Sequence, residues 1–188
     1  MPRQTRQQID DEIMDGAATL FARHGFQETS LQRIADAVGY SKGGLLRHYP
    51  SKEALQEAVV SHCLSELTEI AHAAADHTPG AARDRAVLTG LAHLAFRRPG
   101  FVALLLSTLL RDPSDQESAA LQPVENIIAE ALALPPEPDP DRAVRIAGAL
   151  GALTVARIAL RDRLSTVTVD HLIDVSFDAL GHRAPAAR

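Results

Sequence analysis

Apolar residues recur three or four positions apart along most of the chain, and short polar or proline-containing breaks separate these segments. No segment shows the strict alternation of apolar and polar residues that is typical of a half-buried β-strand. The pattern therefore predicts an all-α protein. We expect helices over residues 8–24, 29–38, 41–48, 51–77, 81–97, 99–111, 113–134, 140–164 and 169–181.

Residues 29–53 are the most informative stretch, because they predict two short helices joined by a tight turn. Thr29 is placed to cap the first helix, and Gln32 stands where it completes a capping box. Gly39 follows at the position of a left-handed C′ residue, and Ser41 can cap the next helix. This arrangement predicts a helix-turn-helix motif.

The second of these helices contains two features that bear on DNA. Gly43 and Gly44 each weaken a helix by about 1 kcal/mol relative to alanine. They fit either a flexible surface helix or a backbone that must approach DNA closely. The chain has only two lysines, Lys42 and Lys52, and each begins one of two successive expected helices. That placement suits contact with phosphate and favours the DNA interpretation.

This part of the chain resembles the DNA-binding domain of TetR-family transcriptional repressors, without gaps over about residues 10–58. The resemblance rests on residues 17–21, 25–26, 29–30, 34–35, 39, 41–43, 48–49 and 51–55. It implies a three-helix DNA-binding domain over residues 1–50 and a helical effector-binding and dimerisation domain over residues 51–188. It further implies a homodimeric repressor on a pseudo-palindromic double-stranded DNA operator, released by a small and lipophilic effector.

By this resemblance, helix 41–48 enters the major groove while helix 29–38 crosses the backbone. Lys42 matches the family's basic position, Gln32 a base-contacting position, and Arg47 is a second candidate for base readout. The remaining expected DNA-contacting residues are Thr29, Ser30, Gly43, Gly44, His48, Tyr49 and Lys52, although Tyr49 also fits the core. Two positions depart from the family. Leu46 stands where a DNA-touching Tyr is common, and Tyr40 replaces a small aliphatic residue.

Small residues give the helix expected at 140–164 a smooth face, which can be buried within the monomer or against a second copy. In the resembled family the last two long helices form the dimer interface. The expected interface residues are Gly148, Gly151, Ala152, Val155, Ala159, Leu172, Val175, Ser176, Ala179 and Leu180.

The resemblance also implies an effector pocket between about residues 60 and 165. The candidate lining residues, which also fit an ordinary core, are Leu64, Leu67, Leu91, Leu94, Phe96, Phe101, Leu104, Leu105, Leu109 and Ile158. Arg97, Arg157 and Arg161 fit either a ligand carboxylate or ion pairs at the surface or an interface.

Composition narrows the class of protein further. The formal net charge is −5, but residues 1–52 hold seven of the 19 Lys and Arg and six of the 24 Asp and Glu. A near-neutral head on an acidic body is compatible with DNA binding by one end. The single Cys63 cannot form an internal disulfide, which favours a cytoplasmic protein. The apolar runs are short or interrupted by arginine, so we expect no membrane span.

Enzyme chemistry finds little support in the sequence. The eight histidines are scattered without metal-ligand spacing, and no glycine loop follows a strand to hold a phosphate. We therefore expect no enzyme activity, no metal and no cofactor. The alternative function is a DNA-bound adaptor that recruits a protein and lacks an effector pocket. An all-helical enzyme or carrier is a third alternative and predicts no sequence-specific retention of DNA.

Overall fold

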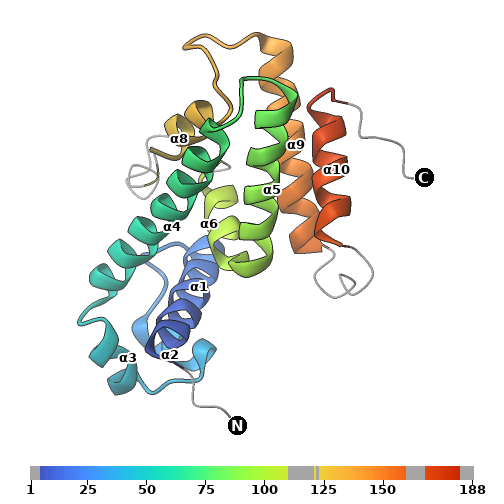
Figure 1. The fold of residues 1–188 in the computed structure, drawn as a ribbon. Helices are drawn as coiled ribbons and strands as arrows, with labels where there is room; N and C mark the ends of the chain where they lie inside the picture. Colours follow the sequence, from blue (N-terminus) through green and yellow to red (C-terminus); the bar gives the residue numbers. More distant parts are fainter. Residues whose placement is uncertain (1–4, 110–120, 122, 160–167, 183–188) are drawn as a thin grey trace. The chain divides into compact units, whose positions relative to one another are not determined.

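The computed structural model describes residues 5–109, 121, 123–159 and 168–182, and every regular element in these ranges is an α-helix (Figure 1). The expected all-α fold is confirmed. The helices are α1 (Arg6–His24), α2 (Leu31–Val38), α3 (Lys42–His48), α4 (Lys52–Ala75), α5 (Ala81–Arg97), α6 (Pro99–Leu109), α8 (Pro123–Ala131), α9 (Pro140–Ala159) and α10 (Val169–Ala179).

Most helix starts agree with the capping signals in the sequence. Ser41 caps α3, as expected, and Thr168 caps α10 through its hydroxyl. Helix α1 begins two residues earlier than expected, because Thr5 and Gln8 form a capping box there. Helix α4 ends at Ala75 rather than near residue 77. The expected helix segments at 110–120 and 160–164 lie outside the described residues.

The chain divides into two compact units of packing. The first contains Met1–Leu64 and Arg98–Gln122, and the second contains Ser65–Arg97 and Pro123–Arg188. The boundary therefore falls within α4 rather than at residue 50. These are units of packing, and the expected functional division between residues 50 and 51 stays a prediction.

In the first unit, α1 supplies the core on which the other helices pack. Its buried side chains are those of Ile13, Met14, Ala17, Ala18 and Phe21. His24 falls at helical spacing from Ala17 and Phe21 but is exposed, because α1 ends there and Gly25 turns the chain away. The packing of α1 on α2 leaves no room for a side chain at its crossing point. A Cβ on Gly16 would lie 2.4 Å from the Cγ1 atom of Val38.

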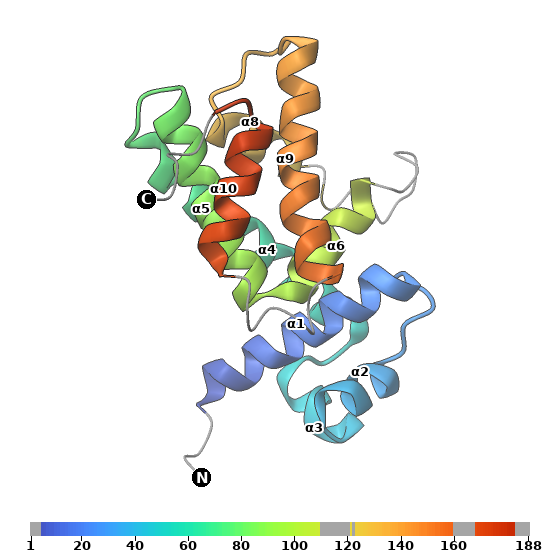
Figure 2. The same ribbon diagram turned by 90° about the vertical axis from the view of Figure 1, so that its right-hand side faces the viewer.

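Helix α6 packs on α1 in the same unit (Figure 2). A side chain of α1 caps its first turn. The Asp15 carboxylate accepts hydrogen bonds from the backbone N–H groups of Gly100 (2.8 Å) and Phe101 (3.4 Å). These N–H groups lie in the first turn of α6, where a helix lacks internal partners. Arg98 adds an ion pair to Asp11, with 2.6 Å between Nη2 and Oδ1. Residues just before and at the start of α6 therefore hold it against α1.

In the second unit, α5, α9 and α10 lie side by side in both views (Figures 1 and 2). Helix α5 buries Val87, Leu88, Leu91, Ala92 and Leu94 among its apolar residues. Helix α10 turns one face inward, whose buried residues are Leu172, Ile173, Ser176 and Phe177. An apolar core therefore joins α5 to α9 and α10, which lie far from it in the sequence.

Candidate nucleic-acid interface

Three small residues set the ends of α2 and the start of α3. Ser30 caps α2, since its hydroxyl oxygen accepts a hydrogen bond from the Arg33 N–H at 3.2 Å. Gly39 adopts the left-handed conformation with φ of 76°, as its place after α2 predicts. Ser41 then accepts from the Gly44 N–H at 3.0 Å and starts α3. These caps set the short connection of the helix-turn-helix.

Thr29 does not cap α2, so the capping box expected between Thr29 and Gln32 is wrong. The Thr29 side chain is fully buried, and its hydroxyl donates to the Gly25 carbonyl at 2.7 Å. Gln32 instead donates to the Asp36 carboxylate at 2.7 Å and is exposed. The cap lies one residue later because Ser30 has the extended backbone that a cap requires. Thr29 ties the loop to the end of α1, and its side chain does not face solvent.

Helix α3 has one buried side and one exposed side. Leu45 is fully buried and anchors the helix. Lys42, Gly43 and Arg47 are exposed, and Leu46 is 37% exposed. Within the described part of the chain, neither Lys42 nor Arg47 makes an ion pair. The exposed side of α3 thus presents two cations that are available to an anionic partner.

The two glycines of α3 have different structural explanations. A Cβ on Gly44 would lie 3.2 Å from the Ser41 hydroxyl oxygen, so the capping geometry itself favours glycine there. A Cβ on Gly43 would meet nothing within 4 Å. Packing within the described residues therefore gives no reason for glycine at position 43. Close approach of another molecule's backbone remains as a physical reason.

His48 lies at the end of α3 and is bound to α1. Its Nδ1 atom lies 2.7 Å from Oδ1 of Asp10, and its ring meets Tyr40 edge to face at a centroid distance of 6.4 Å. This contact fixes the last turn of α3 against α1. A phosphate contact by His48 would therefore have to use the remaining, partly exposed part of the ring.

Tyr49 follows α3 and is half-buried, as the core interpretation of this residue requires. Burial, together with the nearby carboxylates of Asp10 and Asp11, raises the pKa of the Tyr49 phenol to about 12. Its hydroxyl therefore stays protonated at neutral pH and can still donate a hydrogen bond. The contact with DNA that we expect for Tyr49 stays a prediction.

Lys52 begins α4, as expected, but its ammonium group is directed to the protein. Nζ donates to the carbonyls of Phe26 at 2.9 Å and Gln27 at 3.3 Å. It also lies 4.2 Å from the centroid of the Phe26 ring, which is a cation–π distance. Lys52 thus holds the loop between α1 and α2 and is less available to phosphate than Lys42.

Arg33 is a further exposed cation that the sequence analysis did not select. It lies on α2 beside Gln32, away from the buried residues Ile34 and Ala35. The helical spacing of the apolar residues places position 33 outside the apolar stripe of α2, which predicts an exposed side chain there. The exposed polar residues of this surface are Ser30, Gln32, Arg33, Lys42 and Arg47.

The ten residues of the expected effector pocket are divided between the two compact units. Leu67, Leu91, Leu94, Phe101 and Leu104 are buried, whereas Leu64, Phe96 and Leu105 are half-buried. The side chains of Leu109 and Ile158 lie outside the described residues. Burial fits core and pocket equally, so the expected effector pocket stays a prediction.

The arginines that could meet a ligand carboxylate have different outcomes. Arg97 forms an ion pair with Glu66, with 2.5 Å between Nη2 and Oε2. Of the two roles considered for Arg97, a ligand contact and an ion pair, the structure shows the ion pair. The Arg157 side chain and Arg161 lie outside the described residues.

Three residues of the expected dimer interface are buried inside the second unit. These are Leu172, Ser176 and Leu180. Gly148, Val155, Ala159 and Val175 are exposed, and Gly151, Ala152 and Ala179 are half-buried. Three of the four exposed large hydrophobic side chains in the described residues lie on α9 and α10. These are Val144, Val155 and Val175, and the fourth is Leu46.

A cavity of about 470 Å³ lies in the second unit, and none of the expected pocket residues lines it. Its polar lining includes Asp84, Arg142 and His182, which the sequence analysis did not select. One signal was available: Asp84 stands on the same helical stripe as Val87, Leu88 and Leu91, where an acid is unusual. In the described part of the chain, no group of three or more His, Cys, Asp or Glu could hold a metal ion. None of the described helices combines the length and apolar character that crossing a membrane requires.

The helix caps, the tight turn and the short helix α3 form a helix-turn-helix in the first compact unit of this all-α protein. Residues 13–59 match the profile of the family described as "Bacterial regulatory proteins, tetR family". Over residues 13–59 the chain therefore matches the DNA-binding domain of the TetR family, as its resemblance implied.

Two curated relatives match about a third of the chain. The HTH-type transcriptional repressor KstR2 of Rhodococcus jostii is 41% identical over 56 residues, which are 30% of this chain and 28% of that protein. The negative transcriptional regulator IcaR of the biofilm operon icaADBC in Staphylococcus aureus is 38% identical over 62 residues, 33% of either chain. The matched segment thus spans about a third or less of the length of these relatives.

Solved structures with the same fold extend over nearly the whole chain. A TetR-family transcriptional regulator from Bordetella parapertussis has a TM-score of 0.66 at 23% identity, covering 93% of this chain and 94% of that one. A TetR-like transcriptional regulator from Rhodococcus sp. RHA1 has a TM-score of 0.62 at 21% identity, covering 95% and 97%. At these identities the likeness concerns the fold.

Proposed function

We propose that the protein is a sequence-specific DNA-binding transcription regulator, and that it acts as a repressor. The observation that carries this proposal is the exposed face of α3, on which Lys42, Gly43 and Arg47 stand free of partners within the matched helix-turn-helix. The matched relatives, a transcriptional repressor and a negative transcriptional regulator, support the direction of control. Helix α3 enters the major groove, and the exposed part of α2 lies along the backbone.

Dimerisation through α9 and α10 is part of the proposal. Three exposed residues support it. Gly148 and Val155 lie on α9, and Val175 lies on α10. An apolar face of this kind is unusual on the surface of a monomer. A two-fold dimer presents two symmetry-related copies of the helix-turn-helix, so its operator is an inverted repeat.

Release from the operator by a small lipophilic effector completes the proposal. The effector must prefer the released state of the dimer, because a ligand with equal affinity for both states shifts no equilibrium. An adaptor that recruits a protein is the alternative, and it needs no such ligand.

Selection of bound DNA from a random pool tests the DNA-binding proposal directly. We expect an inverted-repeat consensus with the unaltered protein and loss of enrichment with the double variant Lys42→Ala, Arg47→Ala. Recovery of DNA without any consensus at moderate salt contradicts sequence-specific regulation. A thermal-shift screen of lipophilic compounds then separates the two forms of regulator, since an adaptor shows no stabilising compound.

A further inference from the structure

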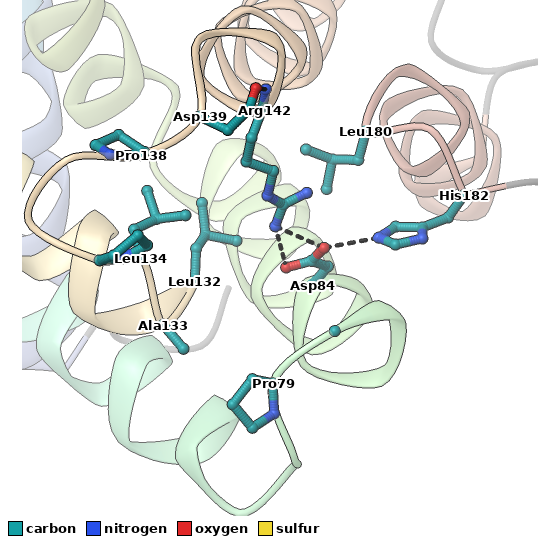
Figure 3. Close-up of a pocket in the computed structure, with 12 residues that line it drawn as sticks. Pro79, Asp84, Leu132, Ala133, Leu134, Pro138, Asp139, Arg142, Leu180 and His182 are labelled. Carbon is teal, nitrogen blue, oxygen red and sulfur yellow. Dashed lines mark hydrogen bonds and ion pairs between the residues drawn. The ribbon is translucent and has the colours of Figure 1, made fainter.

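The cavity in the second unit has an apolar wall and a charged floor (Figure 3). Leu132 and Leu134 follow α8 on one side, and Leu180 lies at the end of α10 on the other. Pro79 and Pro138 lie in the segments before α5 and α9. The volume of about 470 Å³ is within the range of sites that bind small molecules.

Asp84 forms the floor and is only 1% exposed. The Nη2 atom of Arg142 lies 2.7 Å from both of its carboxylate oxygens, and Nε2 of His182 lies 2.7 Å from Oδ2 (Figure 3). A buried carboxylate is costly unless such partners surround it. The three side chains come from α5, α9 and the segment after α10, and they hold one another in place.

Arg142 engages Asp84 through a single nitrogen, which leaves most of its guanidinium unused. Among the described residues its Nε and Nη1 groups have no hydrogen-bond partner. A guanidinium presents paired N–H donors that match a carboxylate in a bidentate arrangement. Asp84 therefore orients Arg142 while the remaining donors stay open to a second anion.

The charges around the cavity favour an anion over a cation. Asp84 already has both its oxygens occupied, so a cationic ligand would have to displace Arg142 or His182. The Asp139 carboxylate caps the start of α9. Its Oδ1 atom accepts hydrogen bonds from the backbone N–H groups of Asp141 (2.7 Å) and Arg142 (3.4 Å).

The wall of the cavity is held in shape by contacts outside it. Arg83 donates to the last carbonyls of α8, from Nε to Ala131 and from Nη2 to Glu130, each at 2.7 Å. Ala133 follows with φ of 51°, a left-handed conformation that is costly for a residue with a Cβ. These bonds fix the turn that carries Leu132 and Leu134, so the cavity is formed before a ligand arrives.

We propose that this cavity binds a small amphipathic anion, whose carboxylate lies on the open donors of Arg142. The apolar body of the ligand packs against Leu132, Leu134, Pro138 and Leu180. The contact of His182 with Asp84 keeps that carboxylate in place beside Arg142.

Isothermal titration calorimetry on the full chain tests this site with three probes of one skeleton. 4-Phenylbutanoate carries a carboxylate, 4-phenylbutanamide is neutral, and 4-phenylbutylammonium is a cation. We expect the carboxylate to bind at least about tenfold more tightly than either of the others.

Variants of Arg142 separate this site from any other place at which the probe can bind. Arg142→Lys keeps a cation beside Asp84 but loses the fork, and should weaken the carboxylate about tenfold without affecting the amide. The double variant Asp84→Leu, Arg142→Met replaces the ion pair with apolar residues and should abolish the preference for the carboxylate while retaining the fold. Arg145→Lys is the matched control, since Arg145 is on the same helix, pairs with Asp141 and does not line the cavity.

Carboxylate affinity that is unchanged in Arg142→Lys, or no tighter than the affinity of the amide, contradicts the proposed site. The measurement contains no DNA, so its failure leaves the regulator proposal intact. Conversely, a failed DNA selection does not alter the result of the titration.

Discussion

The ammonium group of Lys52 lies 2.9 Å from the carbonyl oxygen of Phe26 and above the ring of the same residue. A lysine at a helix start beside a DNA-binding motif suggests a phosphate contact, and here the same position closes a loop within the protein. The two lysines of the chain therefore have separable roles, which salt dependence and stability can distinguish.

Lys42→Ala should weaken operator binding by about 1–3 kcal/mol if the lysine reads a base, and its effect should depend on the operator sequence. The side chain is exposed, so the free energy of unfolding should change by less than about 0.5 kcal/mol. A gel-shift titration at fixed salt measures the affinity. Equal weakening on all DNA sequences would assign Lys42 to a phosphate instead.

Lys52→Met should lower the free energy of unfolding by about 1 kcal/mol, because two hydrogen bonds and a cation–π contact are lost. The slope of the logarithm of affinity against the logarithm of salt concentration should remain near that of the unaltered protein. A slope that falls by about one would restore the phosphate contact that the sequence alone predicts.

Gly43→Ala should separate folding from DNA binding. The added Cβ meets nothing within 4 Å and removes a flexible residue from a helix, so stability should rise by about 0.5–1 kcal/mol. If DNA approaches this backbone, affinity for the operator should fall in spite of the greater stability. Urea unfolding and gel-shift assays measure the two effects, and unchanged affinity would contradict close approach at this residue.

Gly100→Ala is the contrasting control for added volume. Its Cβ would lie 2.0 Å from the backbone oxygen of Asp15, which cannot move without shifting α1. We expect a loss of about 1–3 kcal/mol in the free energy of unfolding.

Tyr49 should make the protein less stable at alkaline pH. Its phenol has a pKa of about 12 in the folded protein and near 10 when unfolded, so the folded state binds more protons between these values. Stability therefore falls as the pH rises through this window, and is unaffected by Tyr49 below it. Tyr49→Phe should remove this part of the pH dependence, while Tyr40→Phe should not. Ultraviolet difference spectroscopy of the two variants should assign the later ionisation to Tyr49.

Val155→Glu should convert the proposed dimer into a folded monomer. Val155 is 55% exposed in the single chain, so the glutamate remains solvated there, whereas two copies facing each other would bury like charges. Light scattering should show the mass of one chain and operator affinity should fall. A dimer that persists would exclude this part of α9 from the interface, and Glu125→Gln on α8 serves as a surface control.

The sequence by itself determined the all-α fold, most helix starts and the helix-turn-helix, because these depend on local caps and on the spacing of apolar residues. Gly39 and Ser41 behave as their positions predict, since their effects act within one turn of helix. Tertiary structure decided which polar residues remain free. His48 and Lys52 have local sequences that fit DNA contact, yet the partners that engage them lie 38 and 26 positions away in the sequence. The meeting of Asp84 with Arg142 and His182 likewise joins residues 58 and 98 positions apart, and a helical period gives no information about such distant pairs.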